Sequence, residues 1–161
     1  MNRVEGAANV ALLECTNPVK GKWRIRWDVR ELGEDKVDYM EEEFDYQPEL
    51  KDIKSVITDW YESQMKEEIL SGFQYEGETV LLSIENLFYF KAIYDLAGQS
   101  GEILPMTFRF GYKQPHNRRF ESVQEWSDFY LAAIKHIQKT LEAGWEKIDA
   151  IDWSMYQLES F

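Results

Sequence analysis

Alternating apolar and polar positions predict a β-hairpin close to the N-terminus. Over residues 22–30 the two kinds of side chain alternate strictly, as in a strand with one buried face. The apolar positions are Trp23, Ile25, Trp27 and Val29. Residues 36–46 are expected to return antiparallel after a turn at Gly33, with acidic side chains opposite the basic ones of the first strand. We expect these charges to pair within the sheet rather than with a nucleic acid, namely Arg24, Arg26 and Arg30 with Glu41, Glu43 and Asp45.

A first helix and a tight hairpin are predicted next. Apolar side chains recur at helical spacing from Pro48 to about Leu70, and Gly72 is expected to end this helix in a left-handed conformation. Residues 73–81 then alternate around Glu76-Gly77-Glu78, which is typical of two short strands joined by a turn.

The helix predicted over residues 84–97 differs from the others because it is apolar almost all round. Ser83 is its expected N-cap. Its narrow polar stripe contains Lys91 and Asp95, and Phe88 falls within that stripe. A helix of this kind is either central to a core or covered by a partner. Phe88, Lys91 and Asp95 are therefore candidates for a protein interface; the alternative is that a loop of the same chain covers Phe88.

The remaining pattern predicts one strand and a last long helix. Residues 106–112 alternate as a half-buried strand, residues 113–119 are expected to be a loop, and Phe120 is expected to return along the strand. Ser122 and Glu125 form a capping box, and the helix they open is expected to end at Gly144. Residues 148–161 are expected to contain a final short helix.

These elements predict an α+β fold in which short antiparallel hairpins pack against three principal helices. Residues 1–21, which contain several glycines and asparagines, are expected to form an N-terminal arm, and residues 22–161 a single domain. The predicted core consists of large apolar side chains from every element: Trp23, Ile25, Trp27, Ile57, Trp60, Phe73, Leu82, Phe90, Phe108, Trp126, Tyr130 and Ile137.

Composition narrows the class of protein. Aromatic residues make up 15% of the 161 residues, which argues against disorder. The formal net charge of −12 makes a nucleic-acid partner unexpected, because such a surface repels phosphates. The same charge leaves open an acidic regulator or inhibitor that competes for a basic site.

The cellular compartment is predicted from the scarcity of cysteine and of long apolar runs. Cys15 is the only cysteine, so an intrachain disulfide is impossible and a reducing cytoplasm is expected. The longest apolar run in the N-terminal segment, Val10 to Leu13, is too short for a signal-peptide core, and no run approaches the length of a membrane span.

Catalytic, metal-binding and cofactor-binding motifs are scarce. The metal-ligand spacings HxxxH and CxxC do not occur, nor do the phosphate-binding patterns GxGxxG and GxxxxGK[ST] or the nucleophile motif GxSxG. We therefore assign no catalytic residue, metal or cofactor, and an enzyme is the less favoured interpretation.

Two small-molecule alternatives stay open. The basic segment that contains Lys113, His116, Arg118 and Arg119 is a candidate rim for an anion. An aromatic pocket with His116 and Arg119 at its rim, typical of a ligand-binding protein or an unrecognised hydrolase, is the second. Its walls would be Tyr89, Tyr94 and Tyr112.

Residues 50–153 contain the hairpin SGFQYEGETVLLSIEN, the strand ILPMTFRFG and the last helix with its GWEKIDAIDW end, in this order. In these segments the chain resembles a bacteriophage and prophage tail-associated domain family of unknown function. The matching positions are Gly72, Phe73, Tyr75, Gly77, Ser83, Asn86, Gly144, Lys147 and Ile148. There are two departures. Relatives often have Gln near the position of Asn86 or Leu87, where this chain has Leu87, and the hairpin of residues 22–46 lies outside the pattern.

The resemblance implies a structural or assembly role in a tail, tail fibre or baseplate, and it implies no catalytic residues. The expected partners are proteins, either further copies of this chain or tail components, with no nucleic acid and no membrane. The expected location is the cytoplasm at synthesis, with association with the virion afterwards.

Overall fold

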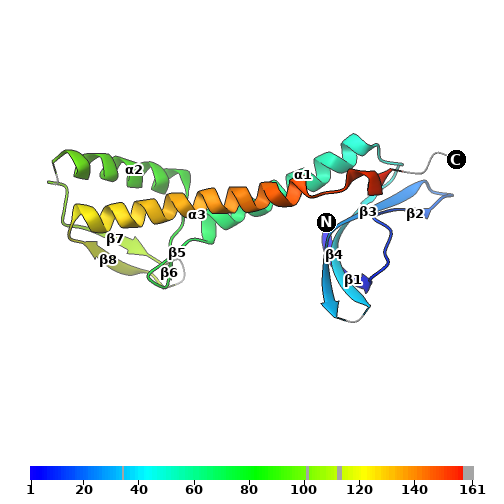
Figure 1. Ribbon diagram of the computed structural model, residues 1–161, viewed down its shortest axis with the longest axis horizontal. Helices are drawn as coiled ribbons and strands as arrows, with labels where there is room; N and C mark the ends of the chain where they lie inside the picture. Colours follow the sequence, from blue (N-terminus) through cyan, green and yellow to red (C-terminus); the bar gives the residue numbers. More distant parts are fainter. Residues whose placement is uncertain (34, 101, 112–113, 158–161) are drawn as a thin grey trace. The chain divides into compact units, whose positions relative to one another are not determined.

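The computed structural model describes residues 1–161 with the exception of 34, 101, 112–113 and 158–161 (Figure 1). This described part has the predicted α+β fold, with three long helices and antiparallel strands. The chain divides into two compact units. The first contains Met1–Trp60 and Ala150–Phe161, and the second contains Tyr61–Asp149.

The first unit contains a four-stranded antiparallel sheet. Its strands are β1 (Asn2–Ala7), β2 (Leu13–Asn17), β3 (Lys22–Gly33) and β4 (Lys36–Phe44), in the order β1-β4-β3-β2. Residues 1–21, expected as an arm, thus supply both edge strands. The local pattern could not indicate this, because the residues of β1 pair with residues of β4 that lie 29 to 39 positions further along the chain.

One face of this sheet is apolar and packs on the first half of helix α1 (Leu50–Ser71). Trp27 on β3 is buried, and its ring meets that of Trp60 edge-on at 6.0 Å between centroids. Ile53 and Ile57, four residues apart on α1, are fully buried. The predicted final helix is the short 3-10 helix η1 (Trp153–Tyr156), which is tied to the sheet by a hydrogen bond of 2.7 Å from the Tyr156 hydroxyl to the Arg26 carbonyl oxygen.

The other face carries the expected charge pairs, with changed partners. Arg24 lies 2.6 Å from Glu43, and Arg26, which is buried, lies 2.7 Å from Glu14. Asp45 instead pairs with Lys22 at 3.0 Å. The basic face is thereby used inside the sheet, as predicted.

Further along β3 the alternation breaks. Asp28 has φ +50°, and the register between β3 and β4 shifts between Trp27 and Arg30. This irregularity leaves Val29 exposed, although it was expected on the apolar side, and lets Arg30 pair with Asp28 at 2.7 Å instead of an acidic residue on the next strand.

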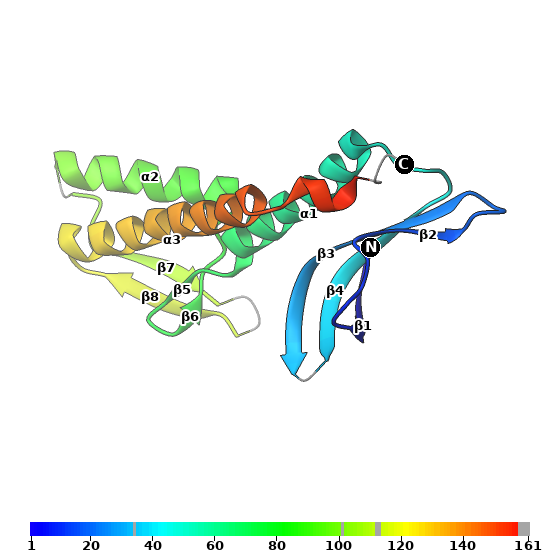
Figure 2. The same ribbon diagram turned by 45° about the vertical axis from the view of Figure 1, so that its right-hand side comes forward.

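The second unit joins three helical segments to two hairpins (Figure 2). It contains the remainder of α1, then β5 (Gln74–Tyr75), β6 (Glu78–Thr79), α2 (Ile84–Gln99), β7 (Met106–Phe110), β8 (His116–Phe120) and α3 (Val123–Asp149). Both views show α2 running antiparallel alongside α3, with the β7–β8 hairpin packed against these helices.

Aromatic rings fill the core of this unit. Phe90 on α2 is fully buried and meets Phe108, Trp126 and Phe129 at centroid distances of 5.0–5.8 Å. The Trp126 indole N–H also donates to the Phe90 carbonyl oxygen at 3.3 Å. Of the core predicted over the whole chain, the buried members are Ile25, Trp27, Ile57, Phe73, Leu82, Phe90 and Trp126. The half-buried members are Trp23, Trp60, Phe108, Tyr130 and Ile137.

Two glycines have roles other than those expected. Gly72 follows the end of α1 but has no positive φ; a Cβ there would collide with the Glu68 carbonyl oxygen. Gly144 does not end α3, which continues to Asp149. It is buried, and a Cβ there would overlap with the side chain of Met65 on α1, so glycine is needed for close helix packing.

The turn of the β5–β6 hairpin is sharper than the sequence indicated. Glu76 and Gly77 both have positive φ, 52° and 84°, as a two-residue type I′ turn requires. In the second hairpin, residues 116–120 form the strand β8 rather than a loop, with His116 opposite Phe110.

Candidate functional site

Helix α2 begins with the N-cap that the sequence predicted. The Ser83 hydroxyl oxygen accepts a hydrogen bond from the Asn86 backbone N–H at 3.2 Å, and the Asn86 side chain donates to the Leu81 carbonyl oxygen at 2.8 Å. The Glu85 backbone N–H and the Ser83 hydroxyl lower the pKa of the Glu85 carboxyl, since both donate to it. These contacts fix where the helix starts and therefore which side chains face outward.

The inner side of α2 is buried, whereas its opposite side is apolar and open. Phe90, Ile93 and Ala97 face the core. Ile84 is 84% exposed and Phe88 77% exposed. Two further large side chains, Tyr89 and Leu96, are about half exposed.

The two charged candidates lie on this open side. The Lys91 ammonium contacts both carboxylate oxygens of Asp95 at 2.6 Å, and this hydrogen bond raises the pKa of Lys91. Because the two charges neutralise each other, this part of the helix is locally less acidic than the net charge of the chain suggests. We call Ile84, Phe88, Tyr89, Leu96 and the Lys91–Asp95 pair the outer face of α2.

The structure thus brings together the three predicted interface residues on one exposed helix face, and within the described residues no loop covers Phe88. Sequence reasoning missed that Ile84 belongs to the same face. The signal was present, because Ile84 lies four residues before Phe88 and side chains at that spacing share one side of a helix.

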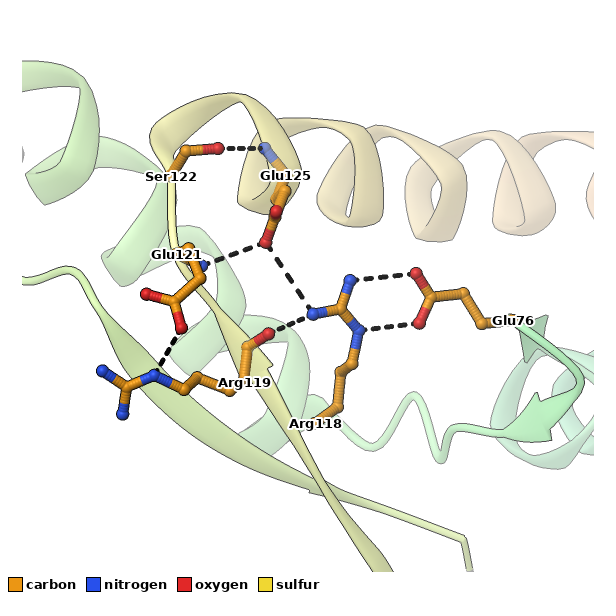
Figure 3. A network of polar contacts seen from close by, with 6 residues as sticks. All are labelled: Glu76, Arg118, Arg119, Glu121, Ser122 and Glu125. Carbon is orange, nitrogen blue, oxygen red and sulfur yellow. Dashed lines mark hydrogen bonds and ion pairs between the residues drawn. The ribbon is translucent and has the colours of Figure 1, made fainter.

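Two of the basic side chains proposed as an anion rim, Arg118 and Arg119, are engaged by carboxylates of the chain itself (Figure 3). Arg118 binds Glu76 through two parallel contacts, Nε to Oε2 at 2.7 Å and Nη2 to Oε1 at 2.9 Å. Its Nη1 lies 3.7 Å from Glu125, and its guanidinium lies over the Phe120 ring at 4.7 Å. Arg118 therefore connects the β5–β6 turn, strand β8 and the start of α3.

The rest of the rim is arranged in the same way. Arg119 Nε lies 2.5 Å from Glu121, and His116 Nδ1 lies 3.7 Å from Glu78. Lys113 lies outside the described residues. An anion would have to displace Glu76 and Glu121, which are already in contact with the guanidinium groups (Figure 3).

The capping box of α3 forms part of this network. The Glu125 backbone N–H donates to the Ser122 hydroxyl at 3.2 Å, as predicted. The Glu125 side chain accepts from the Glu121 backbone N–H at 3.0 Å, one residue earlier than the usual partner. The network therefore helps to fix the start of α3.

Two tyrosines of the suggested aromatic pocket pack on aromatic rings of neighbouring elements. Tyr89 packs on Phe108, and Tyr94 packs on Tyr130. Tyr112 lies outside the described residues.

A different hollow lies where α1 ends. A groove of about 740 Å³ is lined by Leu70 and Leu81, by the carboxylates Glu67 and Glu78, and by Gly111. This groove combines an apolar wall with negative charge. Its residues come from three separate segments, so neighbouring residues in the chain could not indicate it.

Within the described residues, no group of three or more His, Cys, Asp or Glu side chains is placed to hold a metal ion. In the same part of the chain no helix has both the length and the apolar character needed to cross a membrane.

Comparisons with known proteins gave no relative. No protein-family model matches the chain, and neither curated proteins nor solved structures produce a match.

Proposed function

We propose that this chain is a non-enzymatic structural or assembly protein of phage or prophage origin, associated with a tail, tail fibre or baseplate, and that it acts through protein–protein contacts. The observation that supports binding to protein is the outer face of α2. Phe88 is 77% exposed on a helix whose other side packs on the core through Phe90, Ile93 and Ala97.

Folding alone does not account for this arrangement. A helix at the surface of a domain usually turns charged side chains to water, whereas α2 exposes Ile84 and Phe88 there. Contiguous exposed apolar side chains are typical of surfaces that bind another protein. Phe and Tyr side chains are also enriched at interface centres relative to the rest of a protein surface.

The phage assignment rests on the resemblance of residues 50–153 to the tail-associated family. The described structure is compatible with a domain stabilised by hairpins, since the matching residues Gly72, Gly77, Ser83 and Gly144 all have folding roles. For the same reason, these residues say nothing about which partner is bound.

The test combines genome context with a binding assay. Genes for tail components should flank the gene, and a product of those genes should bind the purified chain. Phe88→Asp should abolish that binding, whereas Val19→Asp, the same change at a side chain 94% exposed in the first unit, should leave it intact. A genome context without phage genes, or binding that Phe88→Asp does not weaken, would contradict the proposal.

A second candidate is a binder of small amphiphilic cations, supported by the groove at the end of α1. Its volume of about 740 Å³ is in the range of ligand pockets, which is roughly 300–1,000 Å³. Leu70 and Leu81 would contact an alkyl chain, and Glu67 and Glu78 a cationic head.

Two matched probes separate this candidate from unspecific binding. Butylamine should shift the amide resonances of the groove residues in a saturable way, and butyrate, of similar size and opposite charge, should not. Equal effects of the two probes would remove the candidate.

A further inference from the structure

A polar groove of about 460 Å³ lies between α1 and α3 in the second unit. Gly144 lies against the Met65 side chain, and His136 Nε2 lies 3.0 Å from the Glu68 carbonyl oxygen. Residue numbers therefore rise along α1 as they fall along α3, so the two helices are antiparallel. Lys147 accordingly lies at one end of the groove and Glu68 toward the other.

Two lysines of this groove, Lys139 and Lys147, have charges that no neighbouring carboxylate offsets. Within the described residues neither ammonium group has a carboxylate oxygen within 4.0 Å, and both side chains are exposed. Four other lysines of the chain do contact a carboxylate, namely Lys22, Lys51, Lys66 and Lys91. In a chain with a net charge of −12, two such lysines on one groove form a local exception.

Neutral hydrogen-bond donors line the groove beside these lysines. Thr140 contributes a hydroxyl group and Gln64 a side-chain amide. Among the described residues neither side chain has a hydrogen-bond partner. Phosphate and carboxylate oxygens accept hydrogen bonds from such groups, and most strongly from charged donors such as lysine.

We propose that this groove binds a small anion that carries two or more phosphate or carboxylate groups. Lys139 and Lys147 are eight positions apart, which is about 12 Å along the axis of α3. A ligand with separated anionic groups contacts both ammonium groups without drawing these two like charges together, as a single carboxylate would. The groove volume also lies in the range of ligand pockets, roughly 300–1,000 Å³.

Glu68 makes the proposal testable in both directions. Among the described residues it is the one carboxylate that lines the groove. A Cβ added at Gly72 would collide with Glu68 Oε1, so the Glu68 side chain extends toward the end of α1 and away from Lys147. Its charge repels an anion least at the Lys147 end, and its removal should strengthen binding.

Titration of the isotope-labelled chain with inorganic triphosphate and, separately, with citrate tests the proposal. The salt concentration is kept at about 0.15 M, where exposed charges are screened beyond about 8 Å. Amide resonances of residues 61–68 and 136–147 should shift in a saturable way with at least one anion. Sodium chloride at the same ionic strength should not shift them. Binding of both anions supports the shared chemistry, and binding of one alone identifies phosphate or carboxylate as the preferred group.

Substitutions locate the site with whichever of the two anions binds. Lys139→Gln and Lys147→Gln should each weaken binding by up to about fivefold, as expected for one exposed ion pair, and the double variant should bind more weakly still. Glu68→Gln should strengthen it. Lys135→Gln is the matched control, because Lys135 is exposed on the same helix, has no carboxylate partner among the described residues and does not line the groove.

Two outcomes would overturn the proposal. One is that neither anion shifts the groove resonances, and the other is that Lys135→Gln weakens binding as much as Lys139→Gln and Lys147→Gln do. The site goes beyond the proposed function and shares no residue with the outer face of α2. Neither outcome therefore bears on the binding of a protein through Phe88, which the Phe88→Asp variant tests separately.

Discussion

Phe88 and Phe90 lie two residues apart on α2 and have opposite environments. Phe90 is fully buried among three aromatic rings, whereas Phe88 is 77% exposed. Both are phenylalanines on the same helix, so comparing them separates a side chain that the fold requires from one that it does not. Packing in the core explains Phe90, whereas no ring contact within the described chain explains Phe88.

The largest expected effect is the truncation of Phe90. Phe90→Ala removes a ring from the centre of the core of the second unit, and we expect the free energy of unfolding to fall by about 3–5 kcal/mol. Urea denaturation followed by tryptophan fluorescence would measure it, since Trp126 packs on the same ring. A loss below about 1 kcal/mol would show that α2 is not packed as described.

Two glycines allow the same comparison between a buried and an exposed helix position. Gly144→Ala would drive a methyl group into Met65, and this overlap is expected to lower the free energy of unfolding by about 1–3 kcal/mol. Alanine has a higher helix propensity than glycine, by about 1 kcal/mol, which offsets part of this loss. We therefore expect the free energy of unfolding to fall by a net amount on the order of 1 kcal/mol.

Gly98 is the matched control, because nothing lies within 4 Å of a Cβ added there. Gly98→Ala should therefore stabilise by up to about 1 kcal/mol. Thermal unfolding of the two variants should move the midpoint in opposite directions; a shift in the same direction would contradict the close packing of α3 on α1.

The charged network around Arg118 should have a smaller effect that depends on pH. The Arg118 hydrogen bonds hold the pKa of the Glu76 carboxyl below its usual value near 4.5. A carboxyl with a lowered folded-state pKa stabilises the fold above its unfolded pKa, and this contribution disappears as the pH falls through the folded pKa.

Glu76→Gln should accordingly lower stability at pH 7 and lose this deficit as the pH falls below about 4.5. Glu76 is about half exposed, so we expect the deficit at neutral pH to be less than about 1 kcal/mol. Glu146→Gln, at an exposed position on α3, serves as the control. A deficit that persists unchanged down to pH 3 would exclude the ion pair as its cause.

The smallest expected effect is at Phe88. Phe88→Ala should change the free energy of unfolding by less than about 0.5 kcal/mol at low protein concentration, because the side chain is mostly in water already. Measuring it beside Phe90→Ala under identical conditions sharpens the comparison. A loss of several kcal/mol at Phe88 would mean that this ring belongs to the core.

Local signals predicted the elements well, because caps and turns depend on neighbouring residues. Ser83 and Ser122 cap the helices that they were expected to cap, and the turn falls at Glu76-Gly77. The helical wheel likewise placed Phe88 on the polar side of α2, which is where it is exposed.

Features that depend on distant partners were not predictable in this way. The edge strand β1 pairs with β4, and Gly144 packs on Met65, so neither could be inferred from adjacent residues. The partner of Arg118 could not be foreseen for the same reason, because Glu76 is forty-two positions earlier in the chain.

The central proposal is that the outer face of α2 binds protein. Titration of the isotope-labelled chain with a tail component that binds it, followed by the amide resonances of the chain, tests this most directly. We expect the resonances of residues 84–96 to shift, while those of the β2–β3 turn, which contains Val19, stay in place. Resonances along α2 that stay in place, or shifts centred on another element, would contradict the proposal.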